Sequence, residues 1–101
     1  MEFSWLNKQG VASTQGFEVQ VINRECIEYR EQGKTISVGY EMGMNGGKPC
    51  VLMSPKSFVR WDDTTADNTM SSEDQSRIEA NFRRAMAFQG VNVVVESPGD
   101  T

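Results

Sequence analysis

The residues best suited to chemistry in this 101-residue chain lie in the stretch SFVRWDDTTAD, residues 57–67. Trp61 stands directly before two carboxylates, Asp62 and Asp63, and Asp67 follows four residues later. Neighbouring side chains of an extended segment point to opposite faces, so Asp62 and Asp63 cannot easily share one proton or one water. A calcium loop counted from Asp63 would have threonine at its third position and asparagine, not glycine, at its sixth. The spacing favours neither a carboxylate dyad nor a metal site.

Other catalytic groups are scarce. The chain has no histidine, which is the usual acid or base near neutral pH and the usual partner of a serine or cysteine nucleophile. The two cysteines, Cys26 and Cys50, lack CxxC spacing, and we interpret them as reduced, partly buried small hydrophobes. The glycines of GMNGGKP do not have the spacing of a phosphate-binding loop and precede a strand, not a helix. We therefore expect no catalytic residue, no metal and no cofactor.

The stretch around Trp61 has two remaining interpretations. An aromatic residue at the end of a strand usually closes the core where the chain crosses from sheet to helix. Trp and Arg are also enriched among interface residues whose truncation costs about 2 kcal/mol or more. A loop tolerates variation at little cost to the fold. We predict a partner-binding site, with a solvated loop as the alternative, at Arg60, Trp61, Asp62, Asp63 and Asp67.

Composition limits the partners. The net charge is -4 and the sequence pI is about 4.7, so the chain repels phosphate backbones and we expect no nucleic-acid ligand. A basic protein fits this charge better. No run reaches the roughly 20 apolar residues of a membrane helix, and the N-terminus lacks a signal-peptide pattern, so we expect no membrane contact and a cytoplasmic location. The length predicts one domain, residues 1–101, with a core over about 17–96 and a loose tail at 97–101.

Alternating apolar residues predict strands that begin near Phe17, near Cys26 and near Thr35. A two-residue turn at Gln32–Gly33 would set the register of one hairpin. It places Glu31 opposite Lys34, Tyr29 opposite Ile36, and Ile27 opposite Val38.

A second turn is expected at either Asn45–Gly46 or Gly46–Gly47. Both choices put Val51 and Met53 on the same face as Val38 and Tyr40. Pro49 cannot donate a ladder hydrogen bond, so it should begin the next strand or lie on an edge.

The segment SSEDQSRIEANFRRAMAFQG predicts one long helix. Ser72 is the expected N-cap, with Gln75 completing a capping box, and Gly90 is the expected C-terminal cap. Its apolar stripe contains Ile78, Phe82, Ala85 and Met86, and its expected ion pairs are Glu73 with Arg77 and Glu79 with Arg83. VNVVVE then predicts a last strand.

Together these elements predict an α+β fold, an antiparallel β-meander of four to five strands with the helix packed on its apolar face. Phe3 and Trp5 precede the first clear strand. They are either a docked edge or an exposed patch.

Three parts of the chain, in this order, carry a family resemblance. They are a Y-x-E-x-G-[KR] hairpin with a later glutamate, a Trp–Asp pair after a strand, and a capped helix that is closed by glycine and followed by a valine-rich strand. Over roughly residues 26–96 the chain resembles the bacterial polymorphic-toxin immunity proteins grouped as immunity protein 74. The matching residues are Tyr29, Glu31, Gly33, Lys34, Glu41, Trp61 and Asp62.

The resemblance implies a non-catalytic protein that binds and neutralises a co-encoded toxin domain in the producing cell. A small regulatory or adaptor domain that binds a protein along an exposed sheet edge is the alternative. An enzyme that uses carboxylates or one of the cysteines is a third hypothesis, and a pocket holding a cysteine and two carboxylates would favour it.

Overall fold

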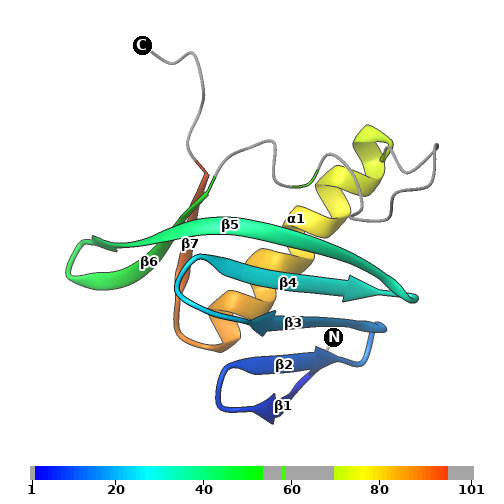
Figure 1. Ribbon diagram of the computed structural model, residues 1–101, viewed down its shortest axis with the longest axis horizontal. Helices are drawn as coiled ribbons and strands as arrows, with labels where there is room; N and C mark the ends of the chain where they lie inside the picture. Colours follow the sequence, from blue (N-terminus) through cyan, green and yellow to red (C-terminus); the bar gives the residue numbers. More distant parts are fainter. Residues whose placement is uncertain (1, 54–57, 59–69, 96–101) are drawn as a thin grey trace.

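The structure is a computed structural model that describes residues 2–53, 58 and 70–95. Within these residues one helix crosses one face of a seven-stranded sheet (Figure 1). The elements in chain order are β1 (Phe3–Asn7), β2 (Gly10–Ser13), β3 (Phe17–Val21), β4 (Cys26–Glu31), β5 (Lys34–Asn45), β6 (Lys48–Met53), α1 (Ser72–Phe88) and β7 (Asn92–Val95). The expected α+β class is confirmed.

The strands lie in the sheet in chain order, from β1 at one end to β7 at the other. All pairs from β1 to β6 are antiparallel, whereas β7 pairs with β6 in parallel, with Val51 opposite Val93. A parallel pair needs a long crossover, and the segment containing α1 supplies it. The expected number of four to five strands was too small, because β1 and β2 also join the sheet. The expected all-antiparallel pairing was wrong for the last pair, which is parallel.

The β4–β5 hairpin has the predicted register. Gln32 and Gly33 form its two-residue loop with φ angles of 51° and 79°, which is the pair of positive values that a type I′ turn requires. The resulting partners are Glu31 with Lys34, Tyr29 with Ile36, and Ile27 with Val38.

The second hairpin turns at Gly46–Gly47, where φ is 61° and 82°. Of the two turns that the sequence allowed, this one pairs Tyr40 with Met53 and so confirms the predicted face of β6. Pro49 is the second residue of β6, and the pairing with β7 begins only at Cys50. The missing proline N–H therefore removes no bond from the β6–β7 ladder.

Helix α1 begins one residue earlier than predicted. Ser71, not Ser72, is the N-cap, because its extended backbone lets its Oγ accept a hydrogen bond from the Asp74 N–H at 3.1 Å. Gln75 does not complete a capping box; its side chain donates to the Met70 carbonyl at 3.2 Å. Two adjacent serines present the same cap chemistry, so spacing alone could not choose between them.

The other end of α1 is closed as predicted. Gly90 has φ 83°, and its N–H donates to the Ala87 carbonyl while the Val91 N–H donates to the Met86 carbonyl, both at 2.9 Å. This is the Schellman arrangement, which favours glycine because of the positive φ.

The core lies between α1 and the sheet. All four residues of the predicted helix stripe are buried, and Phe17 stacks on Tyr29 with ring centroids 5.4 Å apart. The core extends further toward the N-terminus than the expected start near residue 17. Val11 is fully buried, and Phe3 packs against the core cluster. The buried hydrophobic set is Val11, Phe17, Val19, Ile27, Tyr29, Ile36, Val38, Val51, Met53, Phe58, Met70, Ile78, Phe82, Ala85 and Met86.

The loop of the β4–β5 hairpin gives a test of turn chemistry. We expect Gly33→Ala to lower the free energy of unfolding by about 1 kcal/mol, because a non-glycine residue is strained at positive φ. No atom lies within 4 Å of the added Cβ, so steric contact contributes nothing to this loss. Gln32→Asn should instead raise the free energy of unfolding by a few tenths of a kcal/mol, since Asn tolerates positive φ better. Urea unfolding measures both changes, and an unaffected Gly33→Ala variant would contradict the assigned turn.

Candidate functional site

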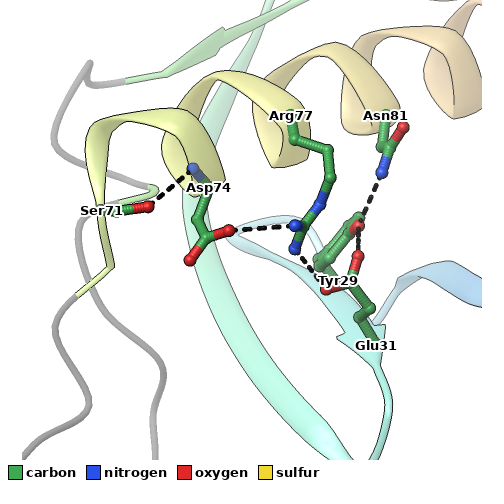
Figure 2. A network of polar contacts seen from close by, with 6 residues as sticks. All are labelled: Tyr29, Glu31, Ser71, Asp74, Arg77 and Asn81. Atoms are coloured by element: carbon green, nitrogen blue, oxygen red, sulfur yellow. Dashed lines mark hydrogen bonds and ion pairs between the residues drawn. The ribbon is translucent and has the colours of Figure 1, made fainter.

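A network of polar side chains joins the sheet to the helix (Figure 2). The Tyr29 hydroxyl donates to Glu31 Oε1 at 2.9 Å, and the Asn81 amide donates to the Tyr29 hydroxyl oxygen at 3.1 Å. The Arg77 guanidinium donates to Glu31 Oε2 at 2.6 Å and to Asp74 Oδ1 at 3.0 Å. Arg77 thus bonds Asp74 and Glu31, and the expected partner Glu73 is solvent exposed.

Two sequence periodicities bring these side chains together. Tyr29 and Glu31 are two residues apart on β4, so both point to the helix side of the sheet. Arg77 and Asn81 are four residues apart on α1, so they lie one above the other on the side that faces β4. Figure 2 shows the two pairs approaching from the two elements.

Burial sets the protonation state of the network. Tyr29 is fully buried, and this desolvation raises the pKa of its hydroxyl; the hydrogen bond from Asn81 acts against that shift and the one to Glu31 adds to it. The hydroxyl therefore stays protonated near neutral pH and serves as a donor, not as a base. Among the described residues, no buried side-chain nitrogen or oxygen lacks a hydrogen-bond partner. The network is a structural clamp between β4 and α1.

Two open recesses flank the tip of the β4–β5 hairpin. One, of about 420 Å³, lies between the hairpin and the β2–β3 turn, and its charged lining residues are Glu18, Arg30, Glu31 and Lys34. The other, of about 410 Å³, lies on the helix side and is lined by Gln15, Glu31, Gln32, Arg77, Asn81 and Arg84. Neither lining contains a cysteine, so neither is the pocket that the cysteine-enzyme hypothesis requires.

The sheet face opposite α1, called the outer face from here on, carries a group of carboxylates. Arg30 on β4 contacts Glu28 Oε1 at 2.5 Å and Glu18 Oε1 at 3.5 Å, so it bridges two strands. Glu41 on β5 is also exposed on this face. By the alternation of β6, Lys48 lies on the same face, so the three carboxylates with Arg30 and Lys48 give the described strands a net charge of -1 there. No helix or strand of the described residues packs on it.

Exposed apolar side chains gather at two other places. Trp5 and Phe88 are 53% and 43% exposed, and their ring centroids are 5.5 Å apart. We call these two residues the aromatic patch, and the neighbouring Leu6 of β1 is 46% exposed. Phe3 is docked against Phe17 and Phe88, so the N-terminal segment combines a docked edge with an exposed patch.

The second place is on β5, where Met42 and Met44 are 56% and 70% exposed. Flexible methionine side chains suit adaptable protein contacts.

The residues predicted to bind a partner, Arg60, Trp61, Asp62, Asp63 and Asp67, lie outside the described residues, and their role stays a prediction. The predicted loose tail at 97–101 also lies outside the described residues. Phe58 is the one described residue of the stretch 57–67; it is buried against Phe82, with ring centroids 5.3 Å apart.

Cys26 is partly buried, as expected, whereas Cys50 is fully buried, and no disulfide joins them. In the part of the chain that the structure describes, no three His, Cys, Asp or Glu side chains are grouped to hold a metal ion.

The sequence contained a signal for the clamp that the site prediction did not use. Tyr29 and Glu31 were assigned to the apolar face of β4 by the hairpin register, and a polar Glu31 on that face needs a partner. Arg77 and Asn81 border the helix stripe at helical spacing. What the sequence could not supply was the position of α1 along β4.

Comparison of the chain with protein-family models, with curated proteins and with solved structures finds no match. Three of the residues behind the family resemblance have roles in the described fold. Tyr29 and Glu31 belong to the clamp, and Gly33 supplies positive φ in the hairpin loop. The described helix is too short and too polar to cross a membrane.

Replacing Tyr29 by Phe tests the clamp. We expect Tyr29→Phe to lower the free energy of unfolding by about 1–3 kcal/mol, because Asn81 and Glu31 each lose a buried hydrogen-bond partner. Tyr40→Phe is the matched control and should cost less, since the Tyr40 hydroxyl bonds the Asn23 carbonyl at an exposed position. Chemical unfolding at neutral pH measures both.

The same pair of variants has a distinct pH dependence. The pKa of both tyrosines is raised above the ordinary value of 10.0, so above that pH the unfolded chain loses protons that the folded chain keeps. The free energy of unfolding should therefore decrease as the pH rises above 10.0. This decrease should be smaller in the Tyr29→Phe variant than in the Tyr40→Phe variant. If the free energy of unfolding fell equally steeply with pH in the two variants, the deeper burial of Tyr29 would be contradicted.

Proposed function

We propose that this chain is a non-catalytic immunity protein that binds a co-encoded bacterial toxin domain and neutralises it in the cytoplasm of the producing cell. The observation that carries the proposal is the outer face, where Glu18, Glu28 and Glu41 outnumber Arg30 and Lys48 on the described strands. The ordered set of motifs similar to the immunity protein 74 family supports the same function.

The outer face suits a basic protein partner. Its charged side chains stand on paired strands in the middle of the sheet, so their backbone is held in place before binding. A preorganised acidic surface speeds the encounter with a basic partner and selects against acidic ones. The net charge of the whole chain, -4, acts in the same direction.

The chemistry of the described side chains supports binding over catalysis. The Tyr29 hydroxyl is held protonated by burial, and both oxygens of Glu31 accept hydrogen bonds. The chain has no histidine to act as a general base. Blocking the toxin's active site or its substrate surface requires only a complementary surface.

The loop at residues 60–67 is the second proposed contact. Trp61 would anchor the partner, and Asp62 and Asp63 would supply acidic groups to a basic partner. If Asp62→Lys/Asp63→Lys changes neither the affinity for the toxin nor the salt dependence of association, this contact is wrong.

Co-expression tests the function itself. The toxin domain encoded beside this protein is expressed with and without it, and survival of the host cells is counted. We expect killing by the toxin alone and survival when both are present. Unchanged killing in the presence of the folded protein would refute the immunity function.

Charge reversal tests the outer face. We expect Glu28→Lys/Glu41→Lys to slow association with the toxin by about tenfold at low salt, with a smaller difference at high salt. Glu79→Lys is the single-site control with the same type of charge change on α1, where Glu79 pairs only with the neighbouring turn through Arg83. Stopped-flow association rates measure the effect, and we expect that control to change the rate by less than twofold. An equal decrease in both variants would assign the effect to net charge and not to this face.

A further inference from the structure

Strand β1 leaves one side of its backbone without a strand partner among the described residues. The Thr14 N–H donates to the Glu2 carbonyl at 2.9 Å, and the pairing of β1 with β2 places Ser4 opposite Ala12 two residues further on. Bonded and non-bonded pairs alternate in an antiparallel ladder, so the N–H and C=O groups of Phe3 and Trp5 point away from β2. Within the described part of the chain these groups have no strand partner, so they can pair with another strand.

Two side chains of this edge, Trp5 and Leu6, are apolar and exposed. The aromatic patch lies on β1 and the adjoining end of α1, with Trp5 more than half exposed. β1 contains neither proline nor a charged residue between Phe3 and Asn7, the devices that usually protect an edge strand. Only a one-residue irregularity of register, between Trp5 and Asn7, interrupts it.

Charges of opposite sign stand at the two ends of β1. Glu2 lies three residues before Trp5 and Lys8 three residues after it, both exposed. Among the described residues neither belongs to an ion pair. Two β1 strands running antiparallel about an axis near Trp5 would bring each Glu2 beside Lys8 of the second copy. The register of β1 shifts by one residue between Trp5 and Asn7, and the long side chain of Lys8 can reach across that shift to Glu2 of the second copy.

The opposite edge of the sheet does not offer the same surface. At β7, Arg83 of α1 donates to the Val93 carbonyl at 3.0 Å, so the helix already occupies a backbone acceptor there. At Met42 and Met44, β5 pairs only with β6 among the described residues, and this stretch contains the charged Glu41, a residue type that protects an edge strand. β1 is therefore the strand that best fits a second strand.

We propose that two copies of this chain pair through β1, antiparallel about a two-fold axis near Trp5, and so join their sheets and cover the aromatic patch. The partner is a second copy because a single strand then supplies both members of each ion pair. The dimer does not depend on the immunity function. Its interface is small, so we expect weak association. The dissociation constant of the dimer should lie between about 10 µM and 1 mM.

Sedimentation velocity of the full chain across that concentration range tests the dimer. We expect the wild type to shift from monomer to dimer, and Trp5→Lys to weaken dimerisation at least tenfold. Met44→Lys places the same charge at a more exposed apolar position away from β1 and should leave dimerisation unchanged. Circular dichroism checks that both variants are folded. A wild type that stays monomeric throughout would overturn the proposal and leave the edge to a different protein.

Charge exchange tests the antiparallel arrangement. Glu2→Lys or Lys8→Glu alone places like charges at both ends of the interface and should weaken dimerisation about tenfold at low salt. The double variant Glu2→Lys/Lys8→Glu restores opposite charges and should recover wild-type association. An equimolar mixture of the two single variants should form a heterodimer, because each then meets its complement. If the double variant stays as weak as the single ones, the antiparallel pairing of β1 is wrong.

Discussion

The Glu31 carboxylate connects the two layers of this protein. One of its oxygens accepts a hydrogen bond from Tyr29 on its own strand, and the other accepts one from Arg77 on α1. Because Asn81 completes the hydrogen bonding of Tyr29, a buried polar group is satisfied on the apolar face of the sheet. The helix stripe alone would allow α1 several positions over a surface of similar side chains. The clamp selects one of them.

Helix α1 covers one face of the sheet, and no described helix or strand packs on the outer face. The alternation of β3, β4 and β5 that buries Val19, Tyr29 and Ile36 toward the helix puts Glu18, Glu28 and Glu41 on the outer face. The same register that builds the core therefore builds an acidic surface, and Arg30 fixes part of it by bridging two strands. Binding a basic protein there would leave the clamp intact. The proposed β1 pairing uses a third part of the molecule, so a dimer would still present an outer face on each copy.

The sequence predicted best where two local signals agreed. The β4–β5 register followed from a two-residue turn combined with alternation, and the helix stripe followed from its spacing. β1 and β2 were missed because FSWLN has no clear alternation and GVAS is short, and their place depends on long-range packing of Phe3 and Val11. The parallel direction of β7 depends on where α1 returns the chain, which no local pattern encodes. The clamp was missed for the same reason: its two halves are 46 residues apart between Glu31 and Arg77.

The proposed binding of a toxin domain to the outer face can be measured by zero-length carbodiimide cross-linking of the purified chain with the toxin domain encoded beside it, followed by mass spectrometry. We expect cross-links to toxin lysines from Glu28 and Glu41 on the outer face, and none from Glu73 and Glu79 on α1. Cross-links from the α1 carboxylates alone, or no complex at all, would contradict it.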